Sequence, residues 1–271
     1  MMRIPPAFGH CSLRLLSVLL FALCAVPAHA GLKVYYLRHA ESGANAAYNP
    51  RWKQVPRDQW PSYLGNPDTF SPKGEEQAQE VAGKLKDHAF DFIVVSPLWR
   101  TRNTILPYLR ATGQKGEIWP ELAEFDVSIE DILEGNENVA GDHPHSPDLF
   151  TGGAEIVLPD NEKEFFTLRP GAATLVKIGA DSEQEVADRR AIVARAAELL
   201  REKFAGTDKT ILVVGHGNAG RLLARELTGD ARVLEDGNHI HNIHLWMAEE
   251  QPDGTFRLEL FNDQAWGRVE R

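Results

Sequence analysis

Short apolar runs that end abruptly in charged or reactive residues are the feature that most limits how this chain can fold. Such runs, rich in β-branched and aromatic side chains, are typical of buried strands. Rigid strands that deliver such residues into loops favour a binding or catalytic site at the strand ends. Three runs, each with the residues that follow it, are Val34–Leu37 before Arg38-His39, Phe90–Val95 before Ser96-Pro97, and Thr210–Val214 before Gly215-His216.

Helical patterns separate these runs. Ser71-Pro72 is typical of a helix start, and apolar residues recur behind it at helical spacing. A helix is also predicted after Pro97, up to a break at Pro107, and a long one from Ser182 to about Phe204. Two further strands are predicted at 243–247 and 256–261. Alternating strands and helices predict a three-layer α/β/α sandwich with a mainly parallel central sheet.

The first 30 residues differ in kind from the rest. Arg3 and Arg14 precede the apolar run Leu15–Val26, and Ala28-His29-Ala30 has the small-x-small pattern of a signal-peptide cleavage site. The run is too short to span a bilayer, which needs about 20 residues. We therefore expect cleavage near Ala30, export to the periplasm or medium, and a mature chain that is not inserted in a membrane.

Both cysteines, Cys11 and Cys24, lie in the segment expected to be removed, so the mature chain has no disulfide framework. Its 241 residues suffice for one domain, predicted at 31–271. Removing Arg3 and Arg14 changes the formal charge from −10 to −12. An acidic body argues against nucleic acid as a partner.

The stretch from about 125 to 177 is long and irregular, with scattered apolar residues that argue for partial packing. Long stretches without strong periodicity are often functional lids. We therefore predict a lid insertion here. It would select the substrate, whose identity the sequence does not give.

The three strand ends carry two histidines and two arginines, counting Arg100 one turn into the helix after Ser96. In an open α/β sheet, ligands bind beyond the carboxyl ends of the strands. Arginine binds phosphate oxygens bidentately, a neutral histidine can attack phosphorus, and a cationic one can stabilise the charge of the transferring group. The set Arg38, His39, Arg100 and His216 therefore suits a phosphoryl dianion.

Fixed positive side chains take the place of a metal ion in such a pocket, so no cofactor is expected. The leaving oxygen still needs a proton. A carboxylic acid beside a phosphate has a raised pKa and can donate near neutral pH. Glu124 and Glu121 are both candidates for this donor.

The motifs resemble those of the histidine phosphatase superfamily, the phosphoglycerate-mutase-like fold. The opening Arg38-His39-Ala40-Glu41-Ser42 with Asn45 is similar to R-H-G-E-[ST]-x-x-N. Three further segments resemble the family in order along the chain, namely Ser71-Pro72-Lys73-Gly74 with Gln77, Ser96-Pro97-Leu98-Trp99-Arg100 with Thr104, and Gly215-His216-Gly217-Asn218.

The resemblance implies that His39 is the nucleophile, with Arg38, Arg100 and His216 forming the phosphate pocket and Asn45 supporting it. Glu124 then matches the family's L-x-E proton donor. The sequence departs from the pattern at Ala40, which replaces glycine and is expected to be tolerated. It lacks the mutase-type Glu-Arg-His-Tyr-Gly, which favours a phosphatase that hydrolyses phosphomonoesters through a phosphohistidine.

Several other interpretations stay open. A phosphomutase or a catalytically silent phosphate binder would share the fold. Gly215, Gly217 and Gly220 also form a dinucleotide-binding fingerprint. His239, His241 and His244 are candidate metal ligands, although alternation along a strand would equally place His239 and His241 on one face.

Overall fold

A computed structural model of the chain describes residues 31–124, 155–174 and 182–267. The predicted signal segment, 1–30, and most of the predicted lid lie outside these residues. No helix in the described ranges is long and apolar enough to cross a membrane.

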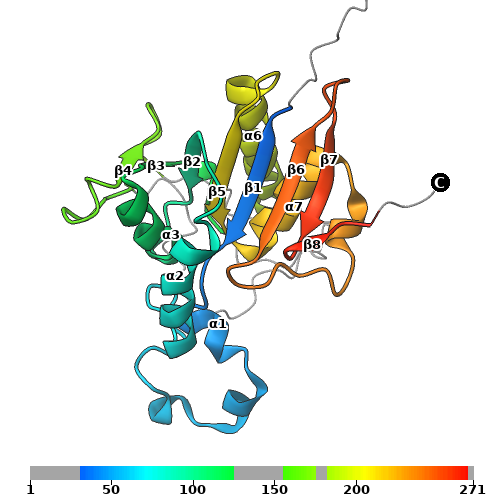
Figure 1. Cartoon of the computed structure of the whole chain (residues 1–271). Coiled ribbons are helices and arrows are strands. Elements are labelled where there is room, and N and C mark those ends of the chain that lie inside the picture. The colour runs from blue at the N-terminus through cyan, green and yellow to red at the C-terminus, as the bar shows by residue number, and fades with distance from the viewer. Residues whose placement is uncertain (1–30, 125–154, 175–181, 268–271) are drawn as a thin grey trace, which may run out of the picture.

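The centre of the fold is one mixed sheet with the strand order β4-β3-β2-β5-β1-β6-β7-β8 (Figure 1). The first five strands in this order run parallel, and β6 and β7 form an antiparallel hairpin beside β1. The strands are β1 (Lys33–Arg38), β2 (Phe92–Val95), β3 (Gly116–Ile118), β4 (Phe166–Leu168), β5 (Thr210–Gly215), β6 (Leu245–Glu250), β7 (Phe256–Phe261) and β8 (Gln264–Ala265).

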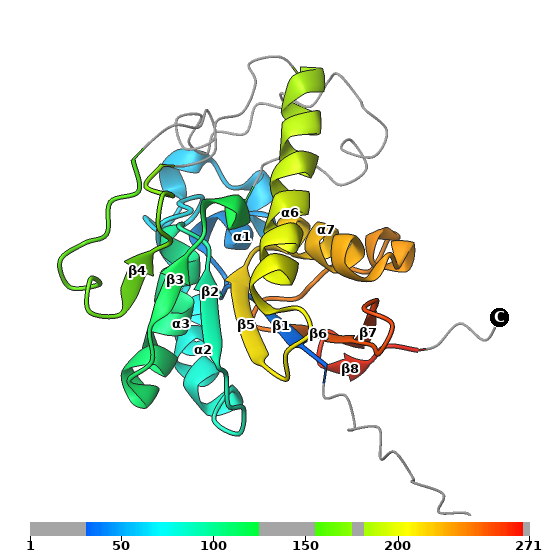
Figure 2. The ribbon, with the colours of Figure 1, turned by 90° about the horizontal axis from the view of Figure 1, so that it is seen from above.

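Helices cover both faces of the sheet, as the view from above shows (Figure 2), so the predicted three-layer sandwich is confirmed. One face carries α2 (Pro72–Lys84) and α3 (Trp99–Thr112), which pack against Ile93 and Leu212 among others. The other carries α6 (Ser182–Phe204) and α7 (Gly217–Thr228). Because both faces are buried, the central parallel strands β2 and β5 are almost continuously apolar.

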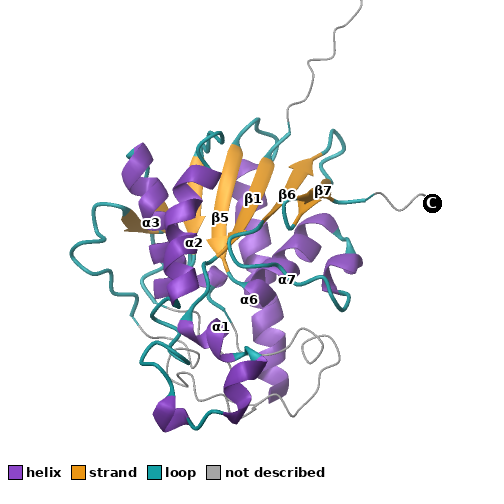
Figure 3. Ribbon diagram, turned by 60° about the horizontal axis from the view of Figure 1, so that its bottom comes forward, coloured by secondary structure: helices purple, strands orange, loops and turns teal. Residues whose placement is uncertain are grey.

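Short elements fill the end of the sheet where the parallel strands stop. In Figure 1, β1 points toward α1 (Gly43–Ala47), and Figure 3 shows this end of the orange sheet from below. The loop Tyr48–Pro67 continues from α1 and contains two 3-10 turns, η1 (Pro50–Gln54) and η2 (Arg57–Gln59). This arrangement leaves the carboxyl ends of β1, β2 and β5 facing the loops rather than a helix layer.

The sequence predicts that the helix after β2 breaks at Pro107, and this prediction is wrong. The helix runs on to Thr112 and closes at Gly113. Ile105, Leu106 and Tyr108, on either side of the proline, are buried against the sheet. Packing of these side chains offsets the main-chain hydrogen bond that proline cannot make.

Part of the predicted lid belongs to the sheet. Within 155–174, β4 pairs in parallel with β3, and the backbone of Phe165 accepts a hydrogen bond from Gly116. A buried ion pair between Glu162 and Arg102 of α3, at 2.5 Å, fixes the same segment. The lid function of the insertion stays a prediction, with this portion anchored at the sheet edge.

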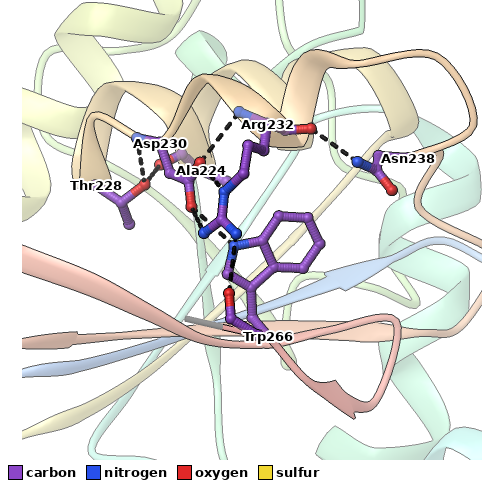
Figure 4. A network of polar contacts seen from close by, with 7 residues as sticks. Ala224, Thr228, Asp230, Arg232, Asn238 and Trp266 are labelled. Atoms are coloured by element: carbon purple, nitrogen blue, oxygen red, sulfur yellow. Dashed lines mark hydrogen bonds and ion pairs between the residues drawn. The ribbon is translucent and has the colours of Figure 1, made fainter. Parts of the chain in front are cut away.

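A polar network fixes the segment that follows α7, at η4 (Ala231–Leu234) (Figure 4). Asp230 accepts hydrogen bonds from Arg232 at 2.5 Å and from the indole of Trp266 at 2.8 Å. The guanidinium of Arg232 also lies 5.0 Å from the Trp266 ring centre. Its carbonyl accepts from Asn238 at 2.8 Å. These contacts therefore fix the backbone at the start of the loop that leads to β6.

Candidate active site

The strand register brings the three predicted strand ends together. Arg38 of β1 pairs with Gly215 of β5, and Val95 of β2 pairs with Val214 of the same strand. The next residues along the chain, His39, Ser96 and His216, therefore leave the sheet side by side. This confirms the expected convergence of the motifs at one edge.

The ring of His39 is fixed in one tautomer. Its Nδ1 lies 2.6 Å from the carbonyl oxygen of Ala40. A carbonyl oxygen only accepts, so Nδ1 must carry the proton, and a neutral ring then has its lone pair on Nε2. Arg100 points its Nε at this Nε2 from 3.3 Å. The buried His39 therefore presents an unprotonated nitrogen beside a guanidinium.

The second histidine lies next to the first. The rings of His39 and His216 are 5.1 Å apart between centroids, and Nε2 of His216 lies 2.7 Å from the Ser96 hydroxyl. The Nδ1 of His216 is buried without a hydrogen-bond partner among the described residues. Buried polar atoms normally have partners, so this nitrogen is a group that a ligand oxygen could satisfy.

Burial and positive neighbours keep both histidines neutral. Desolvation, followed by the charges of Arg100 and Arg38, holds the pKa of His39 well below 6.5. Desolvation, Arg100 and His39 lower the pKa of His216 in the same way. Both causes disfavour the imidazolium. A bound dianion would oppose them, because an opposite charge nearby favours the cationic ring.

The two arginines differ in how they are held. Arg38 donates through Nη1 to the carbonyl of Ile240, and its Nε is buried with no partner among the described residues. Burial lowers the pKa of Arg38, while the charge of Glu124 opposes this shift. Arg100 is 8% exposed and makes the contact with His39 described above. Both guanidiniums remain charged, because arginine is not deprotonated in proteins.

The two candidate proton donors, Glu121 and Glu124, differ in the residues that their carboxylates contact. Glu121 is buried and forms an ion pair with Arg169, which lies just after β4. Glu124 instead accepts a hydrogen bond at 3.3 Å from the backbone of Ala219, in the first turn of α7. That turn directly follows His216. Of the two, Glu124 is the one whose carboxylate contacts the turn that follows His216.

Asn45 is placed indirectly. Its Oδ1 accepts from the backbone of Ser42, closing a capping box at the start of α1, and from Nδ2 of Asn242 at 3.4 Å. The same Asn242 Nδ2 donates to the carbonyl of His39 at 2.8 Å. Asn45 is therefore tied to the loop that carries His39.

Side chains from three elements hold the backbone of this loop. Thr104 of α3 accepts from the amide of Ala40 at 2.9 Å, and Gln77 of α2 accepts from the amide of Glu41 at 2.8 Å. Asn242 completes the set. Thr104 and Gln77 stood in the motifs without an assigned role, whereas nothing in the sequence marked Asn242. The methyl group of Ala40 is buried in the apolar cluster under α2 and α3, which accounts for its tolerance in place of glycine.

The three clustered histidines lie in a loop, so the expectation that His239 and His241 share a strand face is wrong. The strand β6 begins only at Leu245, because the backbone of Ile243 has a φ of 55°, which is outside the extended region. Nδ1 of His239 lies 3.4 Å from Nη1 of Arg221, whereas the ring centroids of His241 and His244 are 5.4 Å apart. Among the described residues, no group of three or more potential ligands could hold a metal ion.

The chain matches known proteins in family and fold. Three solved phosphatases each share the fold at a TM-score of 0.51. They are the alpha-ribazole phosphatase of Shigella flexneri (19% identity, covering 88% of this chain and 100% of that one), the phosphoserine phosphatase of Entamoeba histolytica (18%, 85% and 96%) and a mycobacterial glucosyl-3-phosphoglycerate phosphatase (17%, 86% and 99%). No curated protein sequence matches significantly.

The family model "Histidine phosphatase superfamily (branch 1)" matches residues 34–264, which include both histidines, both arginines and the closing hairpin of the sheet. Because the match includes Gly215, Gly217 and Gly220, these glycines belong to the phosphatase-type fold, which argues against a dinucleotide-binding fingerprint. The chain belongs to branch 1 of the histidine phosphatase superfamily and is an enzyme of the phosphatase or phosphomutase type.

Proposed function

We propose that the protein is an exported, metal-independent phosphatase that hydrolyses small phosphomonoesters through a phosphohistidine on His39. The observation that carries the proposal is the fixed tautomer of His39, whose Nδ1 donates to the Ala40 carbonyl and leaves Nε2 unprotonated, as a nucleophile must be. The positive groups needed to bind a phosphoryl dianion are the side chains around it.

In the first step the phosphate displaces the contact between Arg100 and His39. Arg38 and Arg100 then hold the phosphate oxygens, and Nδ1 of His216 supplies a further donor once the dianion raises its pKa. The Nδ2 of Asn45 adds a neutral donor. These groups supply the charge stabilisation that positions the phosphorus in line with Nε2 of His39.

In the second step Nε2 of His39 forms a bond to phosphorus as the ester oxygen leaves. Glu124, protonated beside the bound phosphate, gives its proton to that oxygen, so the alcohol departs neutral. Its carboxylate then takes a proton from water, whose oxygen attacks phosphorus and breaks the P–N bond. Phosphate is released, and His39 and Glu124 return to their starting states.

The decisive test is an assay of the purified protein with an aryl phosphate, with and without a chelator. Wild type is expected to turn over equally in both, and His39→Ala to lose activity. His88→Ala is the matched control, because His88 packs against Tyr35 and Phe90 away from the site. Chelator-sensitive turnover would refute metal independence.

The same assay separates the alternatives. Transfer of the phosphoryl group to a second hydroxyl, rather than to water, would identify a phosphomutase. Phosphate binding without turnover on any substrate would identify a silent binder. A first substrate panel follows from the related structures, whose ligands and names include phosphoserine, 3-phosphoglyceric acid and alpha-ribazole-5'-phosphate.

Export rests on the amino-terminal segment alone, with Arg3, Arg14 and the run Leu15–Val26 before Ala28-His29-Ala30. Expression of the full chain in a bacterial host, followed by fractionation and mass measurement of the product, tests it. The expected product lies outside the cytoplasm and begins at Gly31. A full-length product confined to the cytoplasm would contradict the proposal.

A further inference from the structure

The hydroxyl of Tyr36 makes two hydrogen bonds to the main chain of His216. It accepts from the His216 amide at 2.5 Å and donates to the His216 carbonyl at 2.9 Å. Tyr36 lies in the middle of β1 and is completely buried. His216 is the single residue between β5 and α7, where the regular hydrogen bonding of the strand stops. One buried side chain therefore satisfies both polar main-chain groups of the residue at this junction.

Two glycines make room for the Tyr36 ring. A Cβ added at Gly215 would lie under 3.0 Å from the Tyr36 hydroxyl, and one at Gly220 under 3.0 Å from the edge of its ring. Real Cβ atoms essentially never approach so closely. On another side Trp246 stacks on the ring, with centroids 5.1 Å apart and planes within 3°. These neighbours confine the Tyr36 ring, and the absence of a side chain at Gly215 and Gly220 leaves the space that it occupies.

The hydroxyl also stays protonated under the conditions in which the enzyme would work. Burial, followed by the charge of Glu124, raises the pKa of Tyr36 well above its ordinary value of 10. A protonated hydroxyl can accept and donate at once, which is what bonding to both an N–H and a C=O requires. An anionic oxygen could only accept and would repel the carbonyl.

We propose that Tyr36 is a positioning residue that fixes the main chain of His216, and with it the direction of its imidazole. The inference rests on the proposed function, in which His216 holds the phosphoryl group. Its ring lies 2.7 Å from Ser96 and 5.1 Å from the His39 ring, distances that depend on where the strand-to-helix junction is held. The pair Gly215 and Gly220 is explained as the space that this residue requires.

The test is Tyr36→Phe, which removes only the hydroxyl, against Tyr35→Phe as the matched control. Tyr35 is the preceding residue, lies on the opposite face of β1 and packs against His88 and Phe90. Tyr36→Phe is expected to lower kcat for an aryl phosphate by about 10- to 100-fold, since small displacements of a catalytic group are costly. KM is expected to change by less than about threefold.

A residue that only stabilises the fold would give a different result. Thermal stability would fall, but kcat per folded molecule would match that of Tyr35→Phe, and this result would overturn the proposal. The same would follow from an unchanged affinity for orthovanadate, because a displaced His216 must weaken a ligand that mimics the transferring group. We expect Tyr36→Phe to weaken orthovanadate binding by about 10-fold or more.

A second pair of variants keeps the test meaningful if Tyr36→Phe folds poorly. Gly215→Ala places a methyl group against the Tyr36 hydroxyl, so its activity is expected to fall sharply. In a Tyr36→Leu background the methyl has room, and Gly215→Ala should cost much less there. Equal losses in both backgrounds would show that the glycine is not matched to the tyrosine.

The outcomes for this inference and for the proposed function can be told apart. If wild type hydrolyses phosphomonoesters and the two tyrosine variants behave alike, only the role of Tyr36 is refuted. If wild type binds orthovanadate without turnover, the proposed reaction fails, while weaker binding by Tyr36→Phe still supports the positioning role. A wild type that neither binds nor hydrolyses refutes both.

Discussion

The side-chain amide of Asn242 donates to the main-chain carbonyl of His39 at 2.8 Å, joining two residues that lie 203 positions apart. The bond holds the backbone of the proposed nucleophile, whereas Thr104 and Gln77 hold the next two residues of the same loop, Ala40 and Glu41. It means that the geometry of His39 depends on the loop before β6 as well as on β1.

Replacing Asn242 by alanine should therefore lower activity more than stability. Loss of its two hydrogen bonds, to His39 and Asn45, costs about 1–3 kcal/mol of unfolding free energy, whereas a shifted His39 is expected to lower kcat by about 10-fold. Asn238→Ala is the matched control, since its amide also donates to a carbonyl at 2.8 Å, that of Arg232, away from His39. Equal losses of kcat in the two variants would contradict the prediction.

The pH dependence of kcat/KM should place the His39 ionisation below 6.5. The nucleophile must be neutral, and burial together with Arg100 and Arg38 lowers its pKa well below that value. The rate constant should therefore stay level from neutral pH down through 6.5 and fall only at lower pH. The measurement is a profile of kcat/KM corrected for the second ionisation of the substrate. An acid limb centred at or above 6.5 would count against the assigned state of His39.

The free energy of unfolding should also decrease as the pH drops below about 6.5. The folded-state pKa values of His39 and His216 are both lowered, so the unfolded chain binds more protons once the pH drops below about 6.5. Stability is then fully present above 6.5 and is lost below it, with a slope of up to about 1.4 kcal/mol per pH unit for each histidine. Denaturant unfolding at several pH values measures it.

The double variant His39→Gln, His216→Gln should make this dependence shallower. A wild-type stability that stays constant between pH 6.5 and 5 would show that the two buried rings do not resist protonation. Phosphate in the buffer must be avoided, because a ligand that binds only the folded state stabilises it.

Glu124→Gln and Glu121→Gln should separate catalysis from packing. Without a proton for the leaving oxygen, Glu124→Gln is expected to lower kcat on an alkyl phosphate by about 10²–10⁴-fold. The loss should be smaller with a nitrophenyl phosphate, whose leaving group needs little protonation. Glu121→Gln removes the partner of Arg169, so it should lower the thermal midpoint and leave kcat nearly unchanged. The reverse pattern would assign the donor to Glu121.

The ion pair between Arg102 and Glu162 should be essential to the docking of residues 155–174. Both side chains are at most 8% exposed. Breaking a buried pair by removing one charge typically costs about 3–5 kcal/mol, because the other charge stays buried without compensation. Glu162→Gln should therefore destabilise the protein strongly in denaturant unfolding. Asp160→Asn is the control, since Asp160 pairs with Lys163 on the surface and should matter little. Similar effects of the two variants would refute the docking role.

Local patterns sufficed to predict the parallel strands β1, β2 and β5 and the start of α2. The serine at position 71 accepts from the amide of Gly74, as a capping residue does, and Pro72 stands at the first helical position. These features involve residues within a few positions of one another. The same holds for His39 and His216, whose place at strand ends follows from where each apolar run stops.

Features set by distant contacts could not be predicted. The three residues of β4 carry no strand signal of their own and are ordered by pairing with β3. The helix α3 continues past Pro107 because the side chains beside the proline, Ile105, Leu106 and Tyr108, are buried against the sheet. The roles of Asn242 and Tyr36 depend on main-chain atoms some 200 and 180 positions away. A chain read locally gives the reactive groups of the site, but not the side chains that hold them in place.

The position of β1 has a consequence for how the protein becomes functional. Its neighbours in the sheet are β5 and β6, so that Lys33 pairs with Thr210 on one side and Glu249 on the other. Both partners lie in the last quarter of the 271-residue chain, β5 at Thr210–Gly215 and β6 at Leu245–Glu250, so a ribosome makes them long after β1. Closing such large loops slows folding, and the apolar strand stays exposed to chaperones meanwhile. This delay suits the proposed export, since a polypeptide without its central strand pairing can still be threaded through a translocation channel as an unfolded polymer.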